Sequence, residues 1–184
     1  MPVEIDEETL VERARRGDAA AFEELVHRYA DRLHAVVLRL VSSDQEAQEA
    51  TQETFLRAWR GIGRFKGESQ IYTWLYRIGV NEANRRLKRG GVSATDQSLD
   101  DLTCEPRDLR PGPAGQSEAH DLRDALEVAV RALPPGYRAP LVLRDIEGLS
   151  TDQAAAIMDL HPAAFKSRLH RARMTVRGAV EAYL

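Results

Sequence analysis

The feature that most constrains the fold is a change of amino-acid composition in the middle of the chain. Residues 90–117 contain four Gly, three Pro and three Ser but few large apolar side chains. Such a segment cannot bury enough apolar surface to offset the entropy lost on ordering it. The sequence on both sides has helical hydrophobic periodicity and no useful length of β-type alternation. We therefore predict an all-α protein whose two small helical domains, residues 1–89 and 118–184, are joined by a flexible acidic linker.

Composition narrows the class of protein without identifying a function. Of the 184 residues, 43% are apolar and 30% are charged, a balance typical of a folded globular chain. No run of about 18 apolar residues is present, which predicts no insertion into a membrane. The start lacks the basic and apolar segments of a signal peptide, which predicts a cytoplasmic location. The single Cys104 can form neither an internal disulfide nor a thiolate metal site alone.

Four helices are expected in the first part of the chain. Apolar residues follow helical spacing over residues 22–40, and Asp18 stands where the N-cap of that helix would lie. Ser43 and Glu46 have the spacing of a capping box, which opens a third helix. The predicted core stripe of the third helix is Ala47, Ala50, Thr51, Phe55, Ala58 and Trp59. A fourth helix is predicted over residues 69–88, after a glycine-rich loop.

The opposite face of the third helix carries one apolar side chain among charged ones. Leu56 lies on this face, and its neighbours at helical spacing are Glu46, Glu49, Gln52, Glu53 and Arg60. An exposed apolar anchor rimmed by charge is typical of a protein-docking patch. A plain solvated face explains the same pattern equally well from the sequence alone.

Aromatic and cationic residues are interleaved from Arg64 to Arg89. The aromatic side chains expected to cluster there are Phe65, Tyr72, Trp74 and Tyr76. Single-stranded or melting DNA needs this combination, because unstacked bases bind to π-faces and phosphates bind to cations. Ordinary core packing is the alternative and is favoured for Trp74. Asn81 and Asn84 lie mid-helix, where Asn is unfavourable, which indicates base contacts or a polar interface.

The last part of the chain has the pattern of a helix-turn-helix. Helices are predicted over residues 122–133 and 137–147, and a short capped helix then reaches Met158. A four-residue break over 159–162 leads into a long helix that runs to the C-terminus. A short helix, a tight turn and a longer basic helix are typical of proteins that bind duplex DNA.

The outward arc of the last helix is basic. The residues spaced for its buried face are Phe165, Leu169, Ala172 and Val176. The side chains left on the outward arc are Lys166, Ser167, Arg168, His170, Arg171 and Arg173. From residue 162 onward five Lys or Arg accompany one acid, a local charge of +4 in a chain of formal net charge −3. Cations beside a helix N-terminus suit phosphate and guanine contacts, although a solvated basic face is the plainer alternative.

One pattern points to an enzyme instead. His27, Asp31 and His34 are spaced i, i+4 and i+7, so they share a helix face and could bind a metal ion. Two surface histidines beside a stabilising Asp are the favoured interpretation, because no fourth ligand is evident. Nothing resembles a nucleophile with its base, a phosphate-binding loop or a catalytic acid pair. We therefore expect no catalysis, no cofactor and no metal.

Two long segments resemble the extracytoplasmic-function (ECF) type of sigma factors, a family of bacterial transcription initiation factors. QETFLRAWRGIGRFKGESQIYTWLYRI, Gln52 to Ile78, is very close to the signature of the family's region 2. ALPPGYRAPLVLRDIEGLSTDQAAAIM, followed by FKSRLHRAR, matches its region 4. The resemblance implies a protein that binds core RNA polymerase and directs transcription from promoters with minus-10 and minus-35 elements.

The resemblance also implies roles for individual residues. Those matching the segment that docks on the polymerase β′ clamp helices are Glu49, Gln52, Glu53, Phe55, Leu56 and Trp59. Those matching the loop and helix surface that capture the minus-10 element are Phe65, Lys66, Gly67, Glu68, Ser69, Gln70, Ile71, Tyr72, Asn81 and Arg85. Those matching the recognition helix for the minus-35 element are Lys166, Ser167, Arg168, His170 and Arg171. The polymerase β flap and a cognate anti-sigma factor are further partners that it implies.

Some positions depart from the family pattern. Glu49 stands where Asp is common, which preserves the charge. Ala163-Ala164 replaces a Gly-Thr pair, and Phe165 replaces a smaller residue, which leaves the minus-35 preference open. The five acids of the linker suggest that it lies in the basic RNA path of the polymerase. The competing class is a helix-turn-helix regulator that binds duplex DNA without polymerase, which has no use for an aromatic capture loop.

Overall fold

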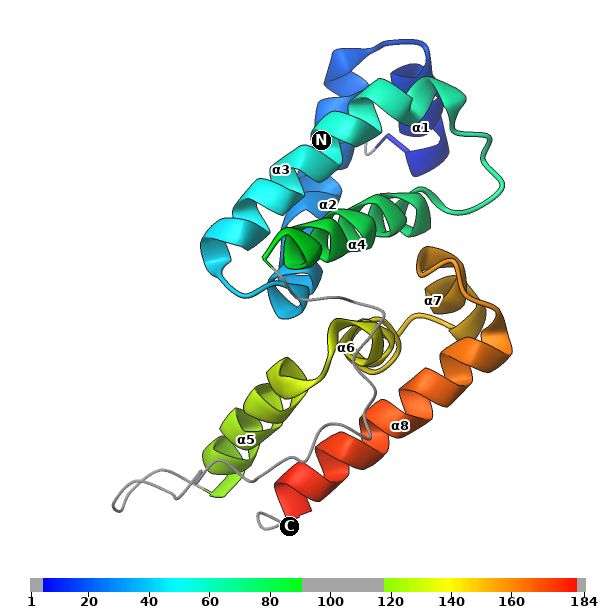
Figure 1. Ribbon diagram of the computed structural model, residues 1–184. Helices are drawn as coiled ribbons and strands as arrows, with labels where there is room; N and C mark the ends of the chain where they lie inside the picture. The colour runs from blue at the N-terminus through cyan, green and yellow to red at the C-terminus, as the bar shows by residue number, and fades with distance from the viewer. Residues whose placement is uncertain (1–4, 91–117, 182–184) are drawn as a thin grey trace. The chain divides into compact units, whose positions relative to one another are not determined.

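The computed structural model describes residues 5–90 and 118–181, and these residues form helices and no strand. The chain divides into two compact units, Met1–Gly90 and Gly91–Leu184, both of which are helical (Figure 1). We call them unit 1 and unit 2. The prediction of an all-α protein with two helical domains is confirmed.

The described residues of unit 1, 5–90, form four α-helices and one 3₁₀ turn. They are α1 (Glu7–Arg15), α2 (Ala19–Leu40), α3 (Asp44–Gly61), η1 (Ile62–Arg64) and α4 (Ile71–Arg89). The first three helices begin at side-chain caps, because Asp6, Asp18 and Ser43 accept hydrogen bonds from free backbone N–H groups of the first turns. The caps expected at Asp18 and Ser43 are therefore confirmed, whereas the second bond of the capping box is shifted, because Glu46 Oε2 accepts from the N–H of Ser42 at 3.0 Å.

The core of unit 1 lies where α2 meets the other three helices. Helix α2 packs against α1, α3 and α4, and α3 also packs against α4 (Figure 1). The predicted stripe of α2 is buried at Leu33, Val36, Val37 and Leu40. Burial of this stripe follows from its spacing of three and four residues, which places all of its side chains on one face of the helix.

The approach of α4 to α2 and α3 requires a residue without a side chain at position 79. A Cβ on Gly79 would lie 2.8 Å from Leu33 Cδ1, 3.5 Å from Val37 Cγ2 and 3.6 Å from Thr54 Oγ1. The hydroxyl of Thr54 is fully buried and donates to the carbonyl of Ala50 at 2.7 Å, which satisfies it inside the core. Gly79 therefore allows α4 to pack closely against α2 and α3.

The described residues of unit 2, 118–181, form four α-helices and one π turn. They are α5 (Glu118–Ala132), α6 (Pro135–Leu141), η3 (Val142–Ile146), α7 (Thr151–Ile157) and α8 (Pro162–Val180). The prediction of one helix over 137–147 is wrong, because the α-helix starts at Pro135 and widens into a π turn at Val142. Pro140 has no N–H to donate, which interrupts the helical ladder just before this turn. Beyond it, the N–H of Glu147 donates to the carbonyl of Val142, five residues back, at 2.9 Å.

Helices α7 and α8 form the predicted helix-turn-helix. Ser150 and Gln153 make both hydrogen bonds of a capping box at the start of α7. The chain then turns through Asp159, whose φ is 55°, and the N–H of Leu160 donates to the carbonyl of Ala155 at 2.9 Å. The buried face of α8 is the predicted stripe, extended by one residue: Phe165, Leu169, Ala172, Val176 and Val180. This stripe faces α5, α6 and α7, which fixes the rotation of α8 about its axis.

Two further predictions concern membrane insertion and the linker in the middle of the chain. Within residues 5–90 and 118–181, no helix is long and apolar enough to cross a membrane. The predicted linker and Cys104 fall on residues 91–117, outside the described part of the chain.

Candidate docking groove and nucleic-acid surfaces

Helix α3 buries one face and exposes the other. Ala47 and Ala58 are fully buried, whereas Leu56 is 51% exposed, as expected for the outer face. Trp59 is 37% exposed, so its assignment to the core stripe is wrong. Its ring lies at the edge of that stripe and contacts Phe22 of α2, with ring centroids 5.1 Å apart. A large ring at the border of two faces can contribute to packing and to a surface at once.

An open apolar groove lies between α2 and α3. Its volume is about 470 Å³, and its lining residues are Phe22, Val26, Gln52, Phe55, Leu56 and Trp59. Four of these six are residues that the sequence assigned to polymerase docking. The α2 wall was missed, because Phe22 and Val26 have the same spacing as the core stripe of that helix. No feature of the sequence separates a groove wall from a core stripe here.

The two acidic residues assigned to docking are engaged within unit 1. Arg86 Nη1 donates to Glu49 Oε2 at 2.8 Å, and Gln45 Nε2 donates to Glu49 Oε1 at 3.2 Å. The hydrogen bond from Arg86 and, next, that from Gln45 lower the pKa of Glu49 below its ordinary value. Glu53 accepts from Arg57 Nε at 2.8 Å. Both carboxylates are therefore already paired with arginines of unit 1.

The loop assigned to base capture is exposed between two buried ends. Phe65 is 7% exposed, with its ring 5.2 Å from that of Trp74, and Ile71 is 2% exposed. The exposed residues between them are Lys66, Gly67, Glu68, Ser69 and Gln70. Gly67 has a φ of 74°, which only glycine adopts readily. Phe65 and Ile71 thus anchor the loop, and their side chains face the core in this conformation.

Only part of the predicted aromatic cluster lies at the surface. Tyr76 joins the cluster through its contact with Tyr72, but it is fully buried and offers no surface to a base. Tyr72 is half-buried, and its ring packs edge-on against Tyr76 with centroids 6.1 Å apart. Trp74 is half-buried against Phe65, which agrees with the interpretation of Trp74 as a packing residue. Tyr72 is therefore the more exposed member of this tyrosine pair.

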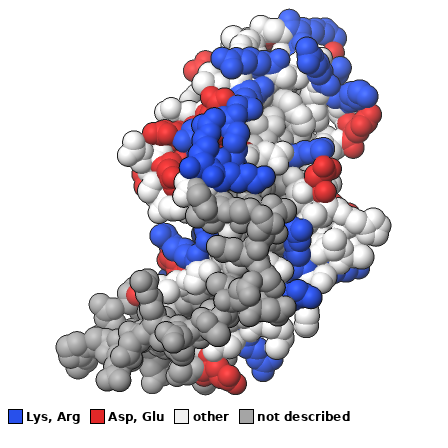
Figure 2. All heavy atoms as spheres, viewed as in Figure 1, with Lys and Arg blue, Asp and Glu red and all other residues white. Residues whose placement is uncertain are grey.

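The C-terminal half of α4 is strongly basic. Figure 2 shows Lys and Arg side chains gathered over this end of the helix, where Arg86, Lys88 and Arg89 form the last turn. Asn81 is exposed one turn earlier, and Arg85 and Asn84 are half-buried. Beneath them lies Glu82, whose side chain is 2% exposed and which the sequence analysis did not single out. The sequence feature that could have identified Glu82 is its spacing of three and four residues from Arg85 and Arg86, which allows ion pairs along one helix face.

The residues predicted for the outward arc of α8 are exposed, except Arg168. Lys166, Ser167, His170 and Arg171 are exposed, whereas Arg168 is half-buried. Arg173 is held by Asp145 of η3 through two hydrogen bonds of 2.8 and 2.6 Å. These bonds raise the pKa of Arg173 and tie the middle of α8 to the π turn. His161 caps α8 by accepting from the N–H of Ala163 at 3.3 Å.

The histidine pattern on α2 does not assemble a metal site. His27 Nε2 lies 3.9 Å from Glu23, and His34 Nε2 lies 3.5 Å from Asp44 on α3. The side chains of His27 and His34 thus have different neighbours, and no cluster of three or more potential ligands occurs in the described ranges. The metal-enzyme hypothesis therefore gains no support.

Comparison with known proteins assigns both units. A model of Sigma-70 region 2 matches residues 25–91, and a model of Sigma-70, region 4 matches residues 123–176. The RNA polymerase sigma-H factor of Pseudomonas aeruginosa strain PAO1 is 36% identical over 187 residues, covering 97% of this chain and 95% of that protein. The ECF RNA polymerase sigma-E factor of Escherichia coli strain K12 is 33% identical over 187 residues, covering 98% of this chain and 97% of that protein.

Solved structures agree with the sequence relatives. CnrH, in complex with the cytosolic domain of CnrY, is similar with a TM-score of 0.68 and 25% identity, covering 95% of this chain and 96% of that one. The sigma factor RpoE of Bartonella quintana, in complex with the anti-sigma factor NepR, has a TM-score of 0.63 and 26% identity, covering 87% of this chain and 96% of that one. The chain belongs to the sigma-70 family and, within it, to the ECF type. It is a sigma factor, which binds core RNA polymerase and directs transcription initiation at promoters.

Proposed function

We propose that this sigma factor acts by binding alone, with unit 1 serving both polymerase docking and strand capture and unit 2 holding the minus-35 duplex. The observation that carries the proposal is the pairing, in unit 1, of an apolar groove on α3 with a basic surface on α4. A protein that only binds duplex DNA needs neither. No catalytic step is assigned to any residue, and the site of action is the cytoplasm, where transcription takes place.

The groove between α2 and α3 is the proposed docking site for the β′ clamp helices. Leu56 and Trp59 supply exposed apolar surface at its edge, and a partly exposed aromatic anchor is the kind of residue that dominates binding energy. Glu49 and Glu53 lie on the same helix, and each is paired with an arginine of unit 1. The groove therefore fits a helical partner that presents apolar side chains toward Leu56 and Trp59.

The proposed minus-10 surface combines the exposed loop over 66–70 with the solvent side of α4. Tyr72 offers part of a ring for an unstacked base, and Asn81 offers an amide that can donate and accept. Arg85 follows one turn later with a cation for the strand's phosphates. Phe65 and Ile71 support this surface from within rather than touching the base.

The proposed minus-35 surface is the N-terminal half of α8. Its rotation is fixed by the buried stripe, so Lys166, Ser167, His170 and Arg171 face solvent together. The N-terminus of the helix follows a tight turn, which is the geometry that places a recognition helix in a major groove. The polymerase β flap is the second partner that we assign to unit 2, on the family resemblance alone.

We further propose that an anti-sigma factor controls this protein. The support is that CnrH and RpoE of Bartonella quintana, both similar to this chain over most of its length, were solved in complex with CnrY and with an anti-sigma factor. The exposed groove on α3 is a surface that such a partner can cover in competition with polymerase.

Leu56→Ala in the full chain tests the docking assignment. Because Leu56 is exposed, the substitution should leave the fold intact and weaken core-polymerase binding by about 1–3 kcal/mol, the usual cost at an apolar anchor. Arg16→Ala, which removes a 76% exposed side chain of unit 1 that does not line the groove, is the control and should bind normally. Binding is measured by titration of labelled core polymerase, with run-off transcription as the functional readout. Unchanged binding of Leu56→Ala with normal helicity would remove α3 as the docking face.

A further inference from the structure

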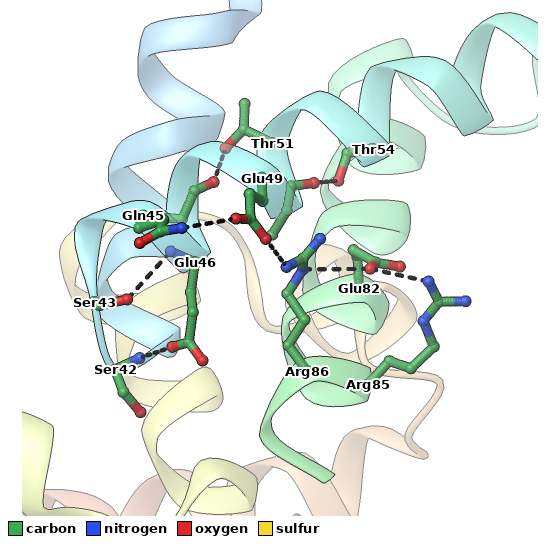
Figure 3. A network of polar contacts seen from close by, with 12 residues as sticks. Ser42, Ser43, Gln45, Glu46, Glu49, Thr51, Thr54, Glu82, Arg85 and Arg86 are labelled. Carbon is green, nitrogen blue, oxygen red and sulfur yellow. Dashed lines mark hydrogen bonds and ion pairs between the residues drawn. The ribbon is translucent and has the colours of Figure 1, made fainter. Parts of the chain in front are cut away.

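Glu82 is the one carboxylate among the described residues that is almost fully buried in unit 1, with 2% of its side chain exposed. Three guanidinium groups approach it. Arg85 Nη2 lies 3.1 Å from Glu82 Oε1, Arg86 Nε lies 3.4 Å from the same oxygen, and Arg57 Nε lies 3.5 Å from Oε2. The ion pairs from Arg85 and Arg86 are drawn in Figure 3.

Two more carboxylates close the network from α3. Glu49 accepts from Arg86, and Glu53 accepts from Arg57, each at 2.8 Å. The cluster thus contains three arginines and three glutamates and has no formal net charge. Its members come from two helices, and the arginines on α4 belong to the basic surface proposed to bind the promoter strand.

Both arginines of the cluster on α4 are already paired with carboxylates of the protein. Arg86 is 19% exposed and contacts both Glu82 and Glu49, while Arg85 is 41% exposed and contacts Glu82. The Nε atoms of Arg85 and Arg86 are buried without a hydrogen-bond partner. An arginine paired in this way must give up its carboxylate before it can neutralise a phosphate, so its contribution to DNA binding is reduced.

We propose that Glu82 is a positioning residue that keeps the sequence-independent affinity of α4 for nucleic acid low, by holding Arg85 and Arg86 on its buried carboxylate. The inference rests on the proposed function, in which α4 binds the displaced promoter strand. Removal of the charge of Glu82 releases one or two cations toward the phosphates. A residue whose only task is to join α3 to α4 has no such effect on DNA binding.

The test uses the full chain, a fluorescently labelled 20-nucleotide oligothymidylate and an oligoadenylate of the same length, and anisotropy titrations from about 0.05 to 1 M salt. Each phosphate newly contacted on a single strand steepens the salt slope by about 0.7. If the gain vanishes near 1 M salt, each released arginine strengthens binding about eightfold at 0.05 M salt. Glu82→Gln should therefore bind both oligonucleotides more tightly, by the same factor, with a slope steeper by about 0.7 to 1.4.

Further variants separate this effect from net charge and from folding. Glu24→Gln removes the same charge from an arginine-paired glutamate on α2, outside the cluster, and should leave the salt slope unchanged. Glu49→Gln leaves the ion pair between Arg86 and Glu82 in place, so it should change the salt slope less than Glu82→Gln does. If Glu82→Gln fails to fold, Glu82→Asp, whose shorter carboxylate reaches Arg85 and Arg86 less closely, decides the question by the same salt slope.

Several outcomes contradict the proposal. Folded Glu82→Gln with unchanged or weaker binding overturns it, as does an increase that Glu24→Gln reproduces or one that differs between the two oligonucleotides. Arg85→Ala tests the underlying function separately. If Arg85→Ala and Asn81→Ala both leave strand binding unchanged, α4 is not the strand surface and the proposed function fails first. If they weaken binding while Glu82→Gln does not strengthen it, only the inference about Glu82 fails.

Discussion

Gly79→Ala tests how tightly α4 must approach the rest of unit 1. In an open helix interior this substitution stabilises by about 1 kcal/mol, because Ala has the higher helix propensity. Here the new Cβ would lie 2.8 Å from Leu33 Cδ1, whereas carbon atoms at optimal separation are about 3.5–4.0 Å apart. Leu33 is fully buried, so the core must shift to make room. Overpacking of this kind costs about 1–3 kcal/mol, so we expect a net destabilisation of about 1 kcal/mol.

The assay is urea unfolding followed by tryptophan fluorescence. Both tryptophans of the chain, Trp59 and Trp74, lie in unit 1, so the signal reports on that unit alone. Gly178→Ala is the matched control, because a Cβ on Gly178 in α8 meets nothing within 4 Å. Followed by circular dichroism, it should leave unit 2 as stable or stabilise it by up to about 1 kcal/mol.

A double-mutant cycle isolates the contact itself. Leu33→Val withdraws the methyl group that the new Cβ would meet, so Gly79→Ala should cost less in that background than in the parent chain. Two results would refute the reasoning. One is stabilisation of unit 1 by Gly79→Ala, as at an open position, and the other is equal cost of the substitution in both backgrounds.

Two other predictions concern the basic surface of α8 and the N-cap of α2. Arg168→Ala and Arg171→Ala should impair promoter use through the minus-35 element, and at least one should weaken binding to all duplexes and flatten the salt slope by about 0.9, as a phosphate contact does. Titration of promoter duplexes with the polymerase-bound protein at several salt concentrations checks this, and no change in either variant would remove α8 as the reading helix. The stability of unit 1 should fall as the pH drops below about 4, because the N–H of Ala21 and then Arg13 lower the pKa of Asp18 when folded. Asp18 thus stabilises above its unfolded pKa of about 3.8, and this contribution is lost as the pH falls through the lower folded value. Urea midpoints at pH 6 and pH 3.5 should differ less in Asp18→Ala than in the parent, and an equal difference contradicts the assignment.

The helical parts of the fold could be predicted because periodicity and caps are local. The stripe of α2 and the stripe of α8 from Phe165 to Val176 are read directly from spacing, and the capping box at Ser150 needs only four residues. The π turn at Val142 could not be predicted from local sequence. Pro140 lacks the N–H that would continue the helical ladder, but where the hydrogen bonds resume also depends on how α6 packs against α8. Periodicity shows which face is buried but not where a helix changes its winding.

The candidate site was predicted less completely, for a related reason. Leu56 could be placed outside the core because its neighbours on that face are charged. Trp59 could not, because it follows Phe55 by four residues and therefore belongs to the same stripe by spacing. Only the position of α2 decides that Phe55 is 9% exposed while Trp59 is 37% exposed. Glu82 was missed because glutamates are almost never buried unless they are paired, and the partners from α3 are far away in sequence.

The same aromatic residues that close the core of unit 1 also form its proposed docking groove. Phe22 contacts Trp59 across the boundary between α2 and α3, and Phe55 of α3, itself buried, also lines the groove. The groove is therefore present before any partner arrives, and binding need not first reorganise the core. A partner that binds only the folded groove also stabilises unit 1, by about 2.7 kcal/mol at a concentration one hundred times its Kd. On the proposed assignment of both partners to this surface, polymerase and an anti-sigma factor compete for one folded state, and each protects unit 1 from unfolding while it is bound.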